Sequence, residues 1–261
     1  MRFVQFVVPS RALARPFDPA PTQADVDDTT TAVRFLLGGV MLAGAVVYDL
    51  RARRVPNPWW IPFAWLAAVL AVGDVADPAR DWRMLGVRYG ISAVLAGLFY
   101  VLWKLHLFGG ADAKGLMVLA VLAPWPPADT PNAIQPALDA LANGALAMML
   151  VPVGFLLVNL SRGHLRLPAA LLGTQGTLAA ARGAHVWPMQ VVDADAPGGL
   201  RWRYWQRLGG DLPAEYHALE QAGVHTVWVT PKVPFLVPVA GGWAVAWWHG
   251  NLVLAVMASL L

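Results

Sequence analysis

Cysteine is absent from the 261 residues, and charged residues make up only 13% of them. The first absence excludes disulfides, a thiol nucleophile, and cysteine-ligated zinc or iron–sulfur sites. The second sets the chain apart from soluble domains, which carry about twice that share of charged residues. Because 57% of the residues are hydrophobic and gather in long blocks, the composition indicates an integral membrane protein.

A clean secretory signal peptide is also lacking. The opening "MRFVQFVV" is a short apolar segment that Pro9 ends, and an arm rich in proline, aspartate and threonine follows it. We therefore predict a polar N-terminal extension over residues 1–31.

Patterns that would bind a metal or nucleic acid are missing too. The six histidines are scattered, and no two stand at the four-residue spacing that places a pair of ligands on one helix face. We therefore expect no metal and no cofactor. The net charge of +3 is modest and is typical of loops that face anionic lipid. We expect membrane lipid as a partner and no nucleic acid.

The apolar blocks predict an α-helical integral membrane protein with about six transmembrane helices and a small α+β cytoplasmic insertion before the last one. Residues 32–160 would form the membrane domain with the first five spans. Residues 161–232 would form the insertion, in which "HVWPMQVV" and "HTVWVTP" are typical of strands and "PAEYHALEQAG" of a short helix. Residues 233–261 would be one tilted span. The six predicted spans cover residues 32–48, 59–72, 82–103, 112–123, 133–160 and 233–261.

The placement of lysine and arginine predicts how the chain sits in the membrane. The segments after the first, third and fifth spans form a first set, which is basic. The loops after the second and fourth spans form the other set, which holds four aspartates and a single arginine. We therefore predict that the first set faces the cytoplasm and that both chain ends lie outside. The basic set is Arg51, Arg53, Arg54, Lys104, Lys114, Arg162 and Arg166, and the opposite loops hold Asp74, Asp77, Asp81, Asp129 and Arg80.

Two aspartates stand at the predicted cytoplasmic boundary. Asp49 closes the first span, and Asp112 opens the fourth within "GGADAKG". Small residues at four-residue spacing in this motif allow helix backbones to approach closely. We therefore expect a second carboxylate to reach Asp112, although a single aspartate at such a boundary would be an ordinary interfacial acid.

Paired carboxylates have a characteristic chemistry. Two acids that share a site do not ionise together easily, so one proton is held between them. Such a pair can act as a general base on water and as a general acid toward a leaving amine. This is the chemistry of peptide-bond hydrolysis by an aspartic protease.

Both segments resemble known motifs. "GGADAK" resembles the GxGD motif of membrane-embedded aspartic proteases, with Ala111 in place of the second glycine. "YDLRARRVPN" resembles the first-aspartate segment of type IV prepilin peptidases, and "VTPKVPFLVPVAGG" their entry into the last helix. Together the motifs resemble archaeal prepilin and preflagellin (archaellin) peptidases. The resemblance implies catalytic roles for Asp49 and Asp112, supported by Gly109, Gly110, Ala111, Lys114, Pro56 and Asn57.

This family implies a substrate class as well. Its members cut short basic leader peptides from pilin-like or archaellin precursors at the cytoplasmic membrane face, just before a hydrophobic helix. Bacterial relatives also methylate the new N-terminus, but this chain has no cysteine-rich module and no glycine-rich nucleotide loop, so we expect a peptidase only. For Lys114 two partners are open, Asp112 or a lipid phosphate, and we favour the phosphate.

Two alternatives remain. Presenilin and signal-peptide-peptidase enzymes use "YD", "GxGD" and "PAL", and this chain has Tyr48-Asp49 and Pro136-Ala137-Leu138. However, the predicted topology places the PAL triplet on the external side, far from both aspartates. A transporter could use the two acids as proton or cation sites, but no internal repeat with paired broken helices is visible in the sequence.

Overall fold

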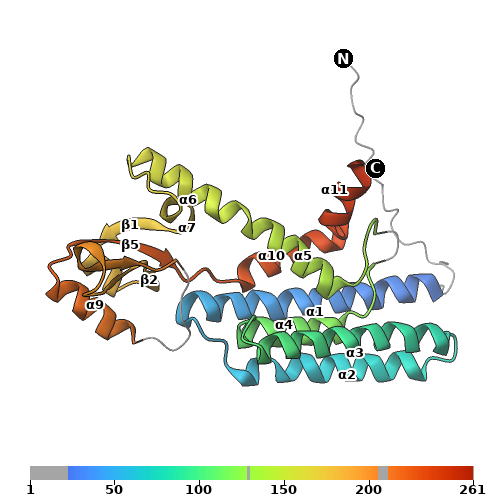
Figure 1. Cartoon of the computed structure of the whole chain (residues 1–261). Coiled ribbons are helices and arrows are strands. Elements are labelled where there is room, and N and C mark those ends of the chain that lie inside the picture. Colours follow the sequence, from blue (N-terminus) through green and yellow to red (C-terminus); the bar gives the residue numbers. More distant parts are fainter. Residues whose placement is uncertain (1–22, 128–129, 205–210, 261) are drawn as a thin grey trace, which may run out of the picture.

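The computed structural model describes residues 23–127, 130–204 and 211–260. Helices α1 (Gln23–Ala52), α2 (Ile61–Ala76), α3 (Trp82–Lys104) and α4 (Gly110–Leu122) run side by side in the body of the molecule (Figure 1). Helix α1 begins at Gln23, within the polar extension predicted for residues 1–31. Residues 1–22 lie outside the described part of the chain. A helix propagates easily once it has nucleated, so α1 extends upstream of its apolar segment.

Within the described residues, four segments are long and apolar enough to cross a membrane, or up to five if a bent helix pair counts as one span. The six predicted spans are therefore not confirmed, although the prediction of a mostly helical membrane protein is. Helix α4 was predicted as the fourth span, but it is too short to cross a membrane. Its 13 residues extend about 20 Å at 1.5 Å per residue, which is less than the roughly 30 Å of a bilayer core. Leu116 and Leu119 of α4 are buried in the core of the bundle, so α4 is an internal helix of this bundle.

The predicted fifth span consists of α5 (Pro136–Met148) and α6 (Leu150–Ser161), which follow each other with only Met149 between them. Helix α6 leads away from the bundle toward the small sheet-containing module (Figure 1).

The last apolar segment is not one straight span. Helices α10 (Leu236–His249) and α11 (Leu252–Leu260) meet at an angle of 54°. Gly250 forms the break with a φ of 62°, a conformation that glycine adopts readily. Asn143 of α5 holds the break, because its Nδ2 donates to Gly250 O (2.9 Å) and its Oδ1 accepts from Leu252 N (2.9 Å). The polar side chain thus satisfies backbone groups that the break leaves without a helical partner.

The module between α6 and α10 contains two small antiparallel sheets, one with strand order β1–β5–β2 and one that pairs β3 with β4. The strands and the helix expected from "HVWPMQVV", "HTVWVTP" and "PAEYHALEQAG" are confirmed. Leu219 and Val227 are fully buried and form the centre of a separate hydrophobic cluster. The elements are α7 (Ala169–Leu172), β1 (Thr174–Thr177), α8 (Leu178–Arg182), β2 (Val186–Pro188), β3 (Gln190–Val192), η2 (Pro197–Gly199), β4 (Leu200–Trp202), α9 (Leu212–Gln221) and β5 (Thr226–Pro231).

A buried asparagine joins the module to the membrane helices. Asn159, near the end of α6, donates from Nδ2 to Ala170 O (3.0 Å) and to Gly173 O (2.7 Å). The module lies at the end of the bundle where α1 finishes (Figure 1). It therefore stands at the same end as Asp49.

Candidate active site

The end of α1 places Asp49 beside a sharp turn. Arg53 N donates to Asp49 O at 2.9 Å, and Arg53 itself has a φ of 51°, a left-handed conformation that commonly ends a helix. The chain then passes through Pro56 in an extended conformation into the short helix η1 (Asn57–Trp59). Proline disfavours a helical residue before it, so this sequence stops α1 shortly after Asp49.

The start of α4 places Asp112. Gly109 precedes the helix, and Asp112 lies in its first turn, where the helix dipole favours a negative charge. A Cβ atom on Gly109 would lie 2.6 Å from Asp112 Oδ2. The carboxylate therefore occupies the space that any other residue at position 109 would fill.

Asp49 and Asp112 line the same cavity, whose volume is about 350 Å³. The two half-buried carboxylates come from segments more than 60 positions apart in the sequence, and they are close enough for their charges to interact. The cavity also has three cationic side chains, Arg53, Arg54 and Lys114, in its lining. The lining residues are Asp49, Arg53, Arg54, Val55, Asn57, Gly109, Gly110, Ala111, Asp112, Lys114, Val233 and Phe235.

The predicted supporting residues fall into two groups. Gly109, Gly110, Ala111, Lys114 and Asn57 line the cavity with the aspartates, whereas Pro56 does not and acts only in the turn.

Lys114 has a partner that neither expectation named. Its Nζ donates to Asn57 Oδ1 at 2.7 Å and lies 5.7 Å from the centre of the Trp103 ring. The pairing with Asp112 is not formed, and the lipid phosphate stays a prediction. An amide oxygen is a suitable acceptor for an ammonium donor, and the turn after α1 places Asn57 within its reach.

The small residues of the motif serve more than one purpose. Ala113 and Gly115 are buried, and a Cβ added to Gly115 would be in van der Waals contact with the ring of Trp60, at 3.5 Å. These residues let the start of α2 pack against α4. Gly109 instead makes room for Asp112 itself, so the expected close approach of a neighbouring segment explains only part of the patch.

Pro136-Ala137-Leu138 lies away from this cavity, at the start of α5. The preceding Gln135 donates from Nε2 to Ala120 O (3.1 Å) and Ala123 O (3.2 Å), at the far end of α4 from Asp112. Since α4 is about 20 Å long, the triplet does not contribute to the aspartate site.

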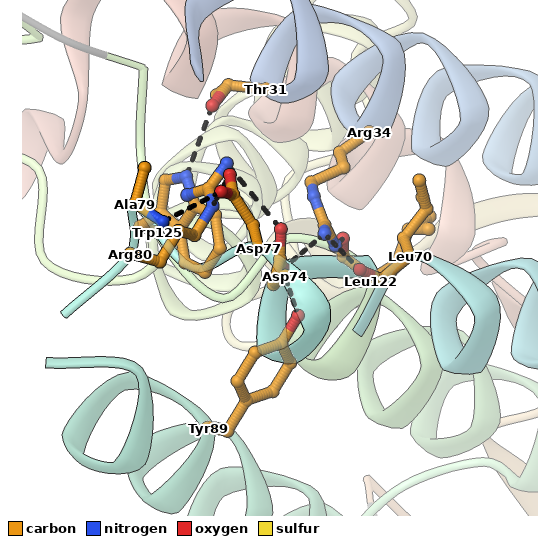
Figure 2. A network of polar contacts seen from close by, with 10 residues as sticks. All are labelled: Thr31, Arg34, Leu70, Asp74, Asp77, Ala79, Arg80, Tyr89, Leu122 and Trp125. Carbon is orange, nitrogen blue, oxygen red and sulfur yellow. Dashed lines mark hydrogen bonds and ion pairs between the residues drawn. The ribbon is translucent and has the colours of Figure 1, made fainter. Parts of the chain in front are cut away.

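Sequence reasoning missed a buried polar network at that far end (Figure 2). Arg34 of α1 and Asp74 of α2 form an ion pair at 2.5 Å, with only 1% and 4% of their side chains exposed. Arg34 also donates to Leu122 O at 2.8 Å, and Tyr89 OH donates to Asp74 at 2.5 Å. The ring of Trp125 lies under Arg34 at 5.2 Å. A lone arginine within an apolar segment is costly without a partner, and this was the available signal.

The same network corrects the view of Asp74 as an acid in an external loop, because Asp74 is a buried residue within α2. Asp77 is partly exposed and is paired with Arg80. Asp129 lies outside the described residues.

In the described part of the chain, no three histidine, aspartate or glutamate side chains gather as a metal-binding group. The other polar side chains in the cavity of Asp49 and Asp112 are those of Arg53, Arg54, Lys114 and Asn57.

The fold and the cavity define a helical membrane protein with a pair of carboxylates at one end of its bundle. The sequence profile of the type IV leader peptidase family matches residues 36–160, which contain both aspartates and every predicted supporting residue. This match confirms the resemblance found in the two motifs.

One relative extends the similarity beyond the matched segment. Preflagellin peptidase from Methanococcus voltae is 23% identical over 245 aligned residues, which cover 87% of this chain and 100% of the relative.

Proposed function

We propose that this protein is an aspartic endopeptidase that removes the leader peptide from type IV pilin-like or archaellin precursors at the cytoplasmic face of the membrane. The observation that carries the proposal is the shared cavity of Asp49 and Asp112 within a segment that matches the type IV leader peptidase family.

The chemistry follows from the two carboxylates. The ionised member takes a proton from water, whose oxygen attacks the carbonyl carbon of the scissile peptide bond. The protonated member hydrogen-bonds to the carbonyl oxygen and then transfers its proton to the leaving amine as the C–N bond breaks. Arg53 and Arg54, which line the cavity, stabilise the negative charge that develops on the carbonyl oxygen.

The basic residues support a cytoplasmic site. Arg51, Arg53 and Arg54 follow directly after Asp49, as expected for a cytoplasmic segment. At the opposite end of the bundle, acids such as Asp74 and Asp77 pair with arginines, which lowers the positive charge there.

Orientation can be tested separately because the natural chain has no cysteine. Ala52 and Ala79 are exposed at opposite ends of the bundle. Ala52→Cys should react only with a reagent that enters the cytoplasm, and Ala79→Cys with one that stays outside. External labelling of Ala52→Cys would contradict a cytoplasmic site.

The activity is tested by co-expression with candidate leader-bearing precursors, followed by N-terminal sequencing of the products. The expected product begins at the residue after the leader, and Asp112→Asn should leave the same precursor intact at equal expression. A precursor panel that the natural protein leaves uncut would refute the peptidase assignment.

A transporter is the second candidate, because the break between α10 and α11 is of the kind that lines ion sites in transporters. Such breaks come in pairs from two repeats, whereas the described residues contain one bent pair. Proton-coupled uptake by vesicles that contain the purified protein would favour this candidate.

A further inference from the structure

A second cavity, of about 510 Å³, lies between α1 and α10 and has an apolar lining. On α1 its lining residues follow one helical face, at positions 32, 36, 39, 40 and 43. The side chains of Leu36 and Val40 are 70% and 60% exposed. The cavity is therefore a groove on the outer surface of the helices, open toward the surrounding membrane.

Aromatic contacts fix the floor of the groove. Trp243 donates from Nε1 to Phe35 O at 3.1 Å, and its ring stacks on Phe35 with 4.3 Å between the ring centres. Trp247 meets the edge of the same ring at 4.5 Å. These contacts hold α10 against α1, so the groove is formed before anything binds in it.

Both walls of the groove lead to the candidate active site. On α1, Ala43 lines the groove and Asp49 lines the active-site cavity, six residues or about 9 Å further along the helix. Trp243 of α10 lines the groove, and Phe235, the residue just before α10, lines the active-site cavity, about 12 Å away. Both walls of the groove therefore lead to the active-site cavity, over similar distances along the chain.

We infer that this groove binds the hydrophobic helix of the precursor while its leader is cut at Asp49 and Asp112. The inference rests on the proposed function, in which the scissile bond lies just before such a helix. Gly39 and Ala43 lack bulky side chains, which allows a second helix to approach closely. Residues from about six to eight positions beyond the scissile bond would enter the groove, given a rise of 1.5 Å per residue.

The first test fills the groove. A Cβ on Gly39 would have Trp243 Nε1 as its nearest neighbour at 3.9 Å, so Gly39→Leu leaves the floor in place and projects its side chain into the groove. Gly97→Leu on α3 is the matched control, because a Cβ there would meet nothing within 4 Å. Gly39→Leu should lower kcat/KM for the precursor by about tenfold, equivalent to about 1.4 kcal/mol. Most of this loss should be in KM, and Gly97→Leu should match the natural protein.

The second test locates the precursor directly. A photo-crosslinking residue at Val40, in the Asp112→Asn background where the precursor stays uncut, should capture the precursor helix. The same residue at Val94 of α3, which is 72% exposed, should not.

The outcomes separate the two proposals. Normal precursor cleavage by Gly39→Leu, or crosslinks from Val40 to lipid alone, would overturn the groove assignment and leave the peptidase intact. Failure of the natural protein to cut any precursor would instead refute the proposed function on which the groove rests.

Discussion

Lys114 Nζ donates a hydrogen bond to Asn57 Oδ1 at 2.7 Å, and this contact joins the two segments that hold the aspartates. Lys114 lies two positions after Asp112 on α4, and Asn57 lies in the turn that follows Asp49 and α1. The contact therefore links α4 to the turn after α1 at the edge of the candidate active site. It orients the two acids relative to each other without touching either of them.

Loss of this contact should affect cleavage more than stability. Lys114→Met and Asn57→Ala should each lower kcat by about tenfold, less than the roughly 100-fold loss caused by a misplaced reacting group. Because the pair is exposed, the thermal midpoint in detergent should hardly change. The double variant should resemble either single one, because both substitutions remove the same interaction.

Lys104→Met is the control for the charge change. Lys104 lies over the rings of Tyr100 and Trp103 and has no contact with the turn after α1. Additive losses in the double variant, or an equal loss in Lys104→Met, would show that Lys114 and Asn57 act independently.

Gly109→Ala should reduce cleavage while the protein stays folded. The added Cβ would lie 2.6 Å from Asp112 Oδ2, so the carboxylate must move. A displacement of about 1 Å can cost on the order of 100-fold in rate. Activity should be measured on protein whose thermal midpoint matches that of the natural chain. Gly90→Ala on α3, where a Cβ would meet nothing within 4 Å, should remain fully active, and an equally active Gly109→Ala would mean that Asp112 tolerates displacement.

The presence of Asp49 and Asp112 in one cavity could be predicted because each lies in a recognisable local motif beside an apolar segment. The strands of the insertion were predictable for a similar reason, since alternation along the chain is a local property. The partner of Lys114 was not predictable, because it depends on how the turn after α1 meets α4 in space. The break at Gly250 has a local sign in His249-Gly250-Asn251, but the apolar segments on both sides favoured one continuous span. The contact with Asn143, more than 100 positions away, was not predictable.

The Arg34–Asp74 pair should be essential for stability but not for chemistry. Arg34→Met leaves the Asp74 carboxylate buried without its closest cation, and breaking a buried ion pair costs about 3–5 kcal/mol. The thermal midpoint in detergent should fall clearly. The specific activity of the molecules that remain folded should be normal, because the pair lies at the opposite end of the bundle from Asp112.

Two further variants test whether the loss of stability in Arg34→Met comes from the broken ion pair. Arg83→Met on α3, where the arginine is exposed and lies over Trp82, should leave the midpoint unchanged. Arg34→Met combined with Asp74→Leu should recover part of the loss, since replacing both members of a buried pair by apolar groups is often tolerated. A normal midpoint in Arg34→Met alone would show that the pair adds nothing to stability.

Asp49 and Asp112 should fail together rather than additively. Asp49→Asn and Asp112→Asn should each remove nearly all cleavage, and the double variant should be little worse than either, because one carboxylate alone cannot both activate water and protonate the leaving amine. Asparagine keeps the size of the side chain, and both residues line a cavity rather than the packed core, so the thermal midpoint should be preserved.

Asp77→Asn, at the other end of the bundle, is the matched control and should cut the precursor normally. The comparison uses initial rates of precursor cleavage at equal protein levels. Substantial cleavage by either single variant would rule out a two-carboxylate mechanism and make the transporter the better explanation of the two acids.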